Sequence, residues 1–344
     1  MKRYRVGVIG VGSIAQWHSQ GYKGVAATQV VAACDLSEER LGRYAAEYGV
    51  SSCYTDYAEM LRRESLDIVS ICTWPQLHHE MTVEACRQGV KAILCEKPMA
   101  LSLDEADDMI RTCELAGVKL QVGHQLRYTV QAVRAKQLID EGQIGGLFSI
   151  HGMRTGGDLL TNAIHTADLM RFFAGDTPVD WVFGQVDATR RRTGYGHAVE
   201  DSAIGYLRFR DGTRGFLECG EITDLGNHRV LINGTEGQIE VNPLGLHDPK
   251  GPWLRARLKN ATRWETVPVT FREEDPFIAE VKALLDWIET GKEPVTTARQ
   301  ARATQEVIFA IFESARRRAV VKLPLQVSKH PLFTLMDSLE PLKA

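Results

Sequence analysis

The sequence has no long apolar run and no excess of positive charge, and both absences narrow what the protein can be. Its 41 Lys and Arg residues against 44 Asp and Glu give a formal net charge of −3, so we expect no surface for nucleic acid. No stretch predicts a membrane span, and the first residues show no signal-peptide pattern. These features predict a cytoplasmic protein without nucleic-acid or membrane partners.

Cysteine is scarce and shows no metal-binding pattern. The chain has 7 cysteines, an odd number, and none forms a C-x-x-C pair. Cys34, Cys72 and Cys95 each fall near the end of an apolar run. Small buried thiols in a reducing compartment account for this better than a zinc site, so we expect no metal.

Repeats, low-complexity linkers and charge blocks are also missing, so length and pattern decide the domain organisation. A chain of 344 residues exceeds the usual size of one hydrophobic core, which favours two domains. Short β-type runs alternate with helical segments up to residue 123, a rhythm that predicts an α/β Rossmann domain over 1–123 with a doubly wound parallel sheet. The runs lie at 4–9, 29–34, 67–72, 91–95 and 119–122.

After residue 123 the rhythm changes to that of an α+β domain, predicted over 124–326, with a tail at 327–344. Two amphipathic helices within about 276–318 close it, and whether they pack back on the first domain stays open. The other elements expected are helices at 129–141 and 158–173, and strands at 147–153, 180–190, 201–209, 214–221, 228–233 and 237–241, which together predict a mostly antiparallel sheet.

A glycine-rich loop directly follows the first β-type run and precedes a helix. The pattern is Gly10-x-Gly12-x-x-Ala15. Gly10 permits a tight turn, Gly12 lets a pyrophosphate approach the backbone, and Ala15 allows close helix packing. Ser13 and Ile14 fall in the first helical turn, whose N–H groups would face the phosphates. The loop predicts dinucleotide binding, with a glycine turn in an unrelated α/β protein as the alternative.

Asp35 ends the second β-type run, 20 positions beyond Ala15. A carboxylate there would accept hydrogen bonds from the adenosine ribose and repel a 2′-phosphate, which favours NAD over NADP. Arg40 is near enough to keep NADP open. The alternative is an ordinary turn or cap aspartate before Ser37.

Polar residues gather after the later β-type runs, where parallel sheets place their ligands. Lys97 is the one with catalytic chemistry, because a desolvated lysine serves as a general acid or base. It could equally hold a substrate hydroxyl or be a surface lysine. The segments concerned are Thr73-Trp74-Pro75 with His78, Glu96-Lys97-Pro98, and Gln125 with Arg127.

A second polar group falls within the helix expected at 158–173. At helical spacing its members share one face, which is either a functional stripe or a solvated surface. They are Asp158, Thr161, Asn162, His165 and Asp168.

Together these motifs resemble the Gfo/Idh/MocA oxidoreductase family along nearly the whole chain. The resemblance rests on the glycine loop, Asp35, the Thr-x-Pro-x-x-His stretch at 73–78, Glu96-Lys97-Pro98, Arg127, the Gly-Gly…His stretch ending at His165, and the segment from Asp275-Pro276 to Leu323-Pro324. It implies NAD or NADP as cofactor, and oxidation or reduction at a secondary hydroxyl or ketone of a sugar, sugar derivative or cyclitol. It also implies an open-faced second sheet, which we expect to be covered in a homodimer or homotetramer.

The resemblance implies a role for each motif residue. Lys97 and His165 are the catalytic pair that faces the reacting carbinol. Cofactor binding is implied for Gly10, Gly12, Ser13, Ile14, Asp35, Arg40, Thr73, Trp74, Pro75, His78, Glu96, Lys97 and Gln125. Substrate binding is implied for Lys97, Arg127, Thr161, Asn162 and His165. Loops at 187–200 and 242–263 would complete the substrate pocket.

The chain departs from the family at Thr161, where members carry an aspartate four residues before the histidine. A hydroxyl cannot stabilise an imidazolium by charge. Asp158 or Asp168 is then the expected substitute, Lys97 is expected to carry more of the proton transfer, and Thr161→Asp is expected to be tolerated.

Three rival functions stay open at this point. One is an NAD-dependent enzyme that cleaves glycosides by transient oxidation and elimination. Another is a non-catalytic NAD(P) sensor, against which the retention of Lys97 and His165 argues. The third is a dihydrodiol or biliverdin-type reductase, which shares the fold.

Overall fold

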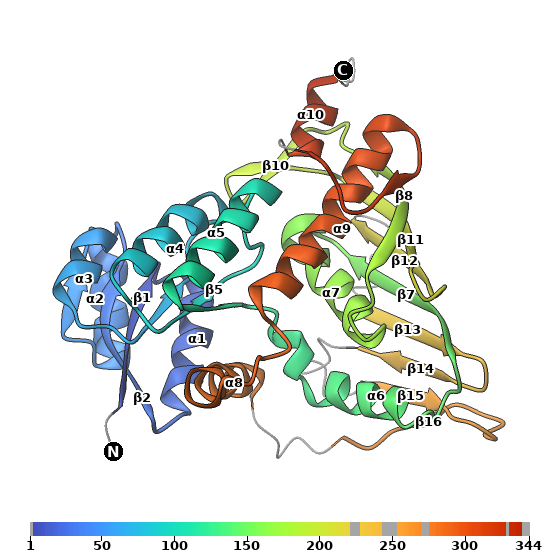
Figure 1. The fold of residues 1–344 in the computed structure, drawn as a ribbon, viewed down its shortest axis with the longest axis horizontal. Helices are drawn as coiled ribbons and strands as arrows, with labels where there is room; N and C mark the ends of the chain where they lie inside the picture. Colours follow the sequence, from blue (N-terminus) through green and yellow to red (C-terminus); the bar gives the residue numbers. More distant parts are fainter. Residues whose placement is uncertain (1–2, 221–227, 243–252, 270–274, 328–329, 339–344) are drawn as a thin grey trace. The chain divides into compact units, whose positions relative to one another are not determined.

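The computed structural model describes residues 3–220, 228–242, 253–269, 275–327 and 330–338, and the chain divides into two compact units (Figure 1). The first unit comprises Met1–Tyr128 and Glu274–Arg302, and the second comprises Thr129–Glu273 and Ala303–Ala344. The chain therefore returns to the first unit for one late segment, instead of following the simple ranges 1–123 and 124–326.

The first unit contains the predicted parallel sheet. Its strand order is β3-β2-β1-β4-β5-β6, with every pair parallel. The order reverses between β1 and β4, and ligands bind at such a switch point beyond the carboxyl ends of the strands. The strands are β1 Tyr4–Ile9, β2 Thr28–Cys34, β3 Ser52–Tyr54, β4 Ile68–Ile71, β5 Ala92–Cys95 and β6 Lys119–Val122.

Helices bury an apolar face against this sheet, and local caps fix where they begin. The hydroxyl of Ser102 accepts the N–H of Glu105 and so caps the first turn of a helix. Val281 and Leu284 of the late segment lie fully buried in the same core as Val6 and Val8. The helices are α1 Ser13–Lys23, α2 Glu38–Tyr48, α3 Tyr57–Arg63, η1 Pro75–Leu77, α4 His78–Arg87, α5 Leu103–Ala116, η2 Gln125–Tyr128 and α8 Pro276–Thr290.

The second unit contains a mixed sheet of order β16-β15-β14-β13-β7-β12-β11-β8-β17, in which β7 and β12 pair parallel and the other neighbours antiparallel. The mostly antiparallel prediction is confirmed. Its strands are β7 Leu147–Thr155, β8 Val179–Asp187, β11 Ser202–Phe209, β12 Arg214–Gly220, β13 His228–Gly234, β14 Gln238–Val241, β15 Leu254–Arg257, β16 Glu265–Thr266 and β17 Val321–Lys322, beside a separate hairpin of β9 Arg192–Gly194 and β10 His197–Val199.

Helices cover one face of this sheet only, within the part of the chain that the structure describes (Figure 1). They are α6 Val130–Asp140, α7 Ile164–Phe173 and the later part of α9 Ala298–Arg317. Ile311 of α9 packs directly on the paired Gly184 and Gly205, where an added Cβ would lie 2.7 Å and 2.5 Å from the isoleucine side chain. Glycine is needed at both positions because a larger residue would push α9 off the sheet.

One local prediction for the second unit is wrong. The segment 158–173 is not one helix, because a π-helical turn, η3 Leu159–Ala163, precedes α7. A π turn closes on the fifth residue instead of the fourth, so the expected alignment of one polar face is shifted. The expected tail at 327–344 contains α10 Pro331–Ser338, and Leu332 of that helix is buried.

Candidate active site

The glycine loop has the geometry that a bound pyrophosphate needs. Gly10 has φ +82°, and an added Cβ would lie 2.9 Å from the carbonyl oxygen of Cys72, so only glycine fits. Gly12 is the N-cap of α1, and a Cβ there would meet nothing within 4 Å. The backbone over the start of α1 is therefore open to an anion.

Asp35 is held in place by the same loop. The N–H groups of Val11 and Ser37 donate to its two carboxylate oxygens at 3.0 and 2.9 Å, and Arg40 pairs with it at 2.6 Å. Partial burial alone would raise the pKa of Asp35, but Arg40 and the two N–H groups lower it below its ordinary value. The carboxylate is thus fixed and charged where ribose hydroxyls would meet it, while Arg40 stays half-exposed.

A cavity of about 600 Å³ lies over this loop within the first unit. It is large enough for part of a dinucleotide. Trp74 is exposed at its edge, and Thr73 and Asp35 also line it. The full lining comprises Ile9, Gly10, Gly12, Cys34, Asp35, Leu36, Arg40, Thr55, Tyr57, Cys72, Thr73, Trp74, Leu77, Glu80 and Met81. The loop, the carboxylate and the cavity fit a nicotinamide dinucleotide.

The Glu96-Lys97-Pro98 turn follows β5 at the same end of the sheet. Lys97 is partly exposed. Glu96 is buried, and its carboxylate accepts Nε2–H of His18 at 2.8 Å and the backbone N–H of Lys97 at 3.1 Å. The side chain of Glu96 therefore points into the protein, and any contact it makes with a cofactor would be through its backbone.

His78 is likewise a structural residue at this site. Its ring is fully buried, with Nδ1 3.0 Å from the carbonyl oxygen of Pro98 and Nε2 3.1 Å from that of Thr73. Burial lowers the pKa of His78 against the opposing effect of those two carbonyls. The ring joins the Thr73-Trp74-Pro75 loop to the lysine turn, and Pro75 is buried beside it.

Arg127 is 1% exposed, which argues against the substrate contact expected for it. Its guanidinium donates to the carbonyl oxygen of Val295 at 3.0 Å, and Tyr128 of the same η2 turn bonds to Thr296 at 3.0 Å. These contacts tie η2 to the segment that follows α8. Gln125, the other predicted residue of η2, is partly exposed.

The backbone N–H and the hydroxyl of Thr161, in the second unit, are both hydrogen-bonded to a neighbouring carboxylate. Its N–H donates to Asp158 at 2.7 Å, and its hydroxyl donates to the other oxygen of the same carboxylate. The backbone N–H of Leu159 donates to Glu200, which is buried just before β11. Burial and the facing Asp158 raise the pKa of Glu200 to about 7.

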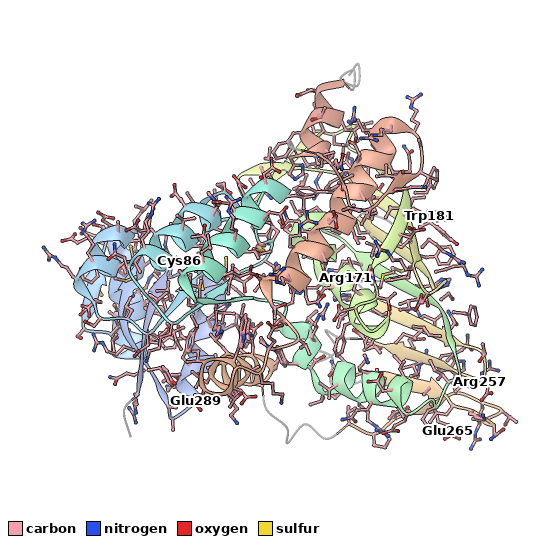
Figure 2. All side chains as sticks on the ribbon, viewed as in Figure 1. Cys86, Arg171, Trp181, Arg257, Glu265 and Glu289 are labelled. Atoms are coloured by element: carbon pink, nitrogen blue, oxygen red, sulfur yellow. The ribbon has the colours of Figure 1, made fainter. Side chains whose placement is uncertain are left out.

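The other members of the expected stripe separate into buried and accessible groups. Asp168 is buried and accepts the hydroxyl of Thr304 at 3.0 Å, and Thr304 in turn accepts Arg171, labelled in Figure 2, at 2.9 Å. Asp168 is thus engaged with α9. Asn162 and His165 are partly exposed, so they are the members that a substrate could reach.

Sequence reasoning missed two buried groups at these sites, His18 and Glu200. A signal for His18 was present, since Ala15, His18, Ser19 and Tyr22 share the buried face of α1 and a histidine there needs partners. Glu200 gave no signal, because only the fold brings it next to Asp158. No cluster of three or more metal-ligating side chains occurs among the residues described, and none of the helices described is long and apolar enough to cross a membrane.

These features define a dinucleotide-binding oxidoreductase, and comparison with known families agrees. Residues 4–124 match the model described as "Oxidoreductase family, NAD-binding Rossmann fold", and residues 136–323 match its "C-terminal alpha/beta domain". The chain belongs to this Gfo/Idh/MocA family and is an NAD(P)-dependent oxidoreductase.

Similar proteins act on sugars and cyclitols. The chain is 27% identical to D-apiose dehydrogenase of Paraburkholderia graminis, over 98% of this chain and 94% of that protein. It is 26% identical to myo-inositol 2-dehydrogenase of Thermotoga maritima, over 93% and 98%. The structure of a levoglucosan dehydrogenase with NADH shares the fold with a TM-score of 0.84, at 21% identity, over 94% of this chain and 100% of that one.

Proposed function

We propose that this enzyme transfers a hydride between NAD and a secondary hydroxyl of a sugar, sugar derivative or cyclitol. The observation that carries the proposal is the loop and cavity of the first unit, in which Gly12 leaves α1 open and Asp35 is fixed at the rim. The relatives named above are dehydrogenases of D-apiose, a sugar, and of myo-inositol, a cyclitol.

Each residue of the first unit has a defined task in this mechanism. The bound nicotinamide would accept or supply the hydride. Gly10 and Gly12 admit the pyrophosphate, and Asp35 accepts hydrogen bonds from the adenosine ribose. Lys97 takes the hydroxyl proton during oxidation and returns it during reduction. His165 stays a prediction as the second group that orients the substrate hydroxyl.

NAD is the proposed cofactor in preference to NADP. The carboxylate of Asp35 is fixed by two backbone N–H groups, so a 2′-phosphate at this position would face a negative charge that cannot turn away. Arg40 could contact such a phosphate only by leaving its ion pair with Asp35. We therefore expect calorimetric titration to show tighter NAD binding than NADP binding.

The experiment that tests the function is a substrate panel with NAD, followed by NADH absorbance. The panel contains myo-inositol, D-apiose, levoglucosan and a simple glycoside. Net NADH formation with a member of the panel supports the proposal. Release of the aglycone without net NADH would instead favour the oxidation–elimination alternative, and NAD binding without any turnover would favour a sensor.

We also propose that a second copy of the chain covers the helix-free face of the second sheet, in a cytoplasmic homodimer or homotetramer. Aromatic rings run across this face: Trp181, labelled in Figure 2, stacks on Tyr206, which meets Phe216 edge-on. Phe183 and Ile204 are exposed there, beside a hollow of about 520 Å³. Ile204→Asp should reduce the mass measured by light scattering, and an unchanged mass would contradict this interface.

A further inference from the structure

A buried hydrogen-bonded pair joins the helix of the phosphate loop to the lysine turn. Nε2 of His18 in α1 lies 2.8 Å from Oε1 of Glu96, and its Nδ1 lies 2.7 Å from the hydroxyl of Ser70 in β4. His18 and Ser70 are fully buried. Because both ring nitrogens have oxygen partners, a protonated ring satisfies both contacts as a donor.

Each member of this pair shifts the pKa of the other toward the charged form. Burial alone would lower the pKa of His18, but the sulfur of Cys72 and the carboxylate of Glu96 raise it well above its ordinary value. Burial alone would raise the pKa of Glu96, but His18, then Lys97 and His78, lower it. Both shifts favour the charged forms, an imidazolium beside a carboxylate. The thiol of Cys95 also faces Glu96, and burial raises the pKa of that thiol well above its ordinary value.

The second carboxylate oxygen of Glu96 is hydrogen-bonded to the backbone of the lysine turn. It accepts the backbone N–H of Lys97 at 3.1 Å, so the carboxylate fixes the peptide from which the lysine side chain departs. Gly123 after β6 leaves no spare room, since an added Cβ there would lie 2.7 Å from Oε1 of Glu96. The carboxylate can hardly move without moving the turn.

We infer that His18 and Glu96 are positioning residues for Lys97. They connect the lysine turn to α1, whose N-terminus would hold the phosphates. Cofactor binding and the placement of the lysine therefore depend on the same hydrogen-bonded pair. This inference rests on the proposed role of Lys97 as the acid/base.

The test compares Glu96→Gln and His18→Gln with the wild type in three measurements. These are NAD affinity by calorimetry, kcat, and KM with the active panel substrate. We expect kcat to fall by about 10- to 100-fold, because a misplaced catalytic group has an effect of that size. We expect the Kd for NAD and the KM to change by less than about threefold, so that the loss is confined to kcat.

Ser19→Ala is the matched control, because Ser19 is the next residue of α1, equally buried, and hydrogen-bonded to Ala15 and Tyr44 instead of Glu96. It should lose stability without a comparable fall in kcat. Glu96→Asp is a second variant that retains the charge, and its kcat should exceed that of Glu96→Gln.

Lys97→Ala separates the two claims. If it abolishes turnover while Glu96→Gln and His18→Gln keep the wild-type kcat, the positioning role is overturned and the proposed function stands. If Ser19→Ala lowers kcat as much as Glu96→Gln does, the effect is only structural and the inference is also overturned. If Lys97→Ala turns over normally, both fail.

Discussion

Each unit of this enzyme buries a glutamate beside its candidate site, and the two glutamates have opposite electrostatic surroundings. Glu96 in the first unit faces the ring of His18, whose pKa is raised toward the imidazolium form. Glu200 in the second unit faces the carboxylate of Asp158. His18 lowers the pKa of Glu96 against the effect of burial, whereas Asp158 adds to burial and raises that of Glu200 to about 7.

The difference teaches that burial alone does not decide whether a carboxyl group is charged. A group with a lowered pKa stabilises the fold above its ordinary pKa, and this stability is lost as the pH falls. A carboxyl with a raised pKa stabilises the fold in its protonated form, and this stability is lost as the pH rises. The contributions of the two glutamates to stability should therefore depend on pH in opposite directions.

Glu96→Gln should have the largest effect on stability, because it breaks the opposite-charge pair and leaves His18 buried without its anion. We expect the free energy of unfolding at pH 7 to fall by about 3 kcal/mol, as for other buried pairs with one partner removed. Urea unfolding measures it. A loss below about 1 kcal/mol would mean that the pair is not charged.

Thr161→Asp should sharpen the contrast by adding a third carboxylate to the second unit. The sequence alone suggests that this change is tolerated. In the structure, however, Thr161 is buried and donates its hydroxyl to Asp158. The new carboxylate would face Asp158 with Glu200 close by, so we expect a loss of about 2 kcal/mol at pH 8 that shrinks toward pH 5. If the variant is as stable as the wild type at pH 8, the change is tolerated, as the sequence alone suggests.

Glu200→Gln should remove the like-charge contact. The carboxyl has an ordinary pKa of 4.5 and a folded pKa of about 7, so its contribution is complete below pH 4.5 and is lost as the pH rises through 7. The neutral amide can accept the Leu159 N–H at every pH and places no charge opposite Asp158. We expect this variant to exceed the wild type by roughly 1–2 kcal/mol at pH 8 and to match it near pH 4.5. Thermal unfolding across this pH range measures the difference in stability between the variant and the wild type. The same difference at pH 8 and at pH 4.5 would contradict the expectation.

Asp35→Ser concerns a carboxylate at the rim of the first unit, where solvent weakens its pairing with the half-exposed Arg40. The change removes the charge that opposes a 2′-phosphate and frees Arg40 to contact it. We expect the ratio of NADP to NAD affinity to rise about tenfold, equivalent to about 1.4 kcal/mol. Calorimetry with both cofactors measures this ratio, and no change in it would remove Asp35 from cofactor choice.

A feature of the fold or the site can be predicted from the sequence when it depends on residues that are close together in the chain. The parallel sheet, the phosphate loop and the position of Asp35 depend on period and spacing along a short stretch, and the sequence predicts them. The partner of Glu96 is 78 positions earlier, and that of Asp158 is 42 positions later. Such pairs exist only once the fold is formed.

The predicted site residues differ in how accessible they are. Glu96, His78 and Arg127 are predicted at the cofactor or the substrate, and each is buried and bonded to the protein itself. A motif records which residues occur together, but it does not distinguish the residues that contact a ligand from those that hold them in place. Lys97, Trp74, Asn162 and His165 are among the predicted residues that keep some exposure.

The most direct test of the account is a single turnover with excess enzyme and NAD, using the active panel substrate carrying deuterium at its carbinol carbon. Stopped-flow absorbance would follow NADH in the wild type and in Lys97→Ala. The account predicts that NADH appears and persists, forms more slowly from the deuterated substrate, and forms about 100-fold more slowly in the variant. NADH that forms equally fast in the variant, or bound substrate that yields no NADH at all, would contradict it.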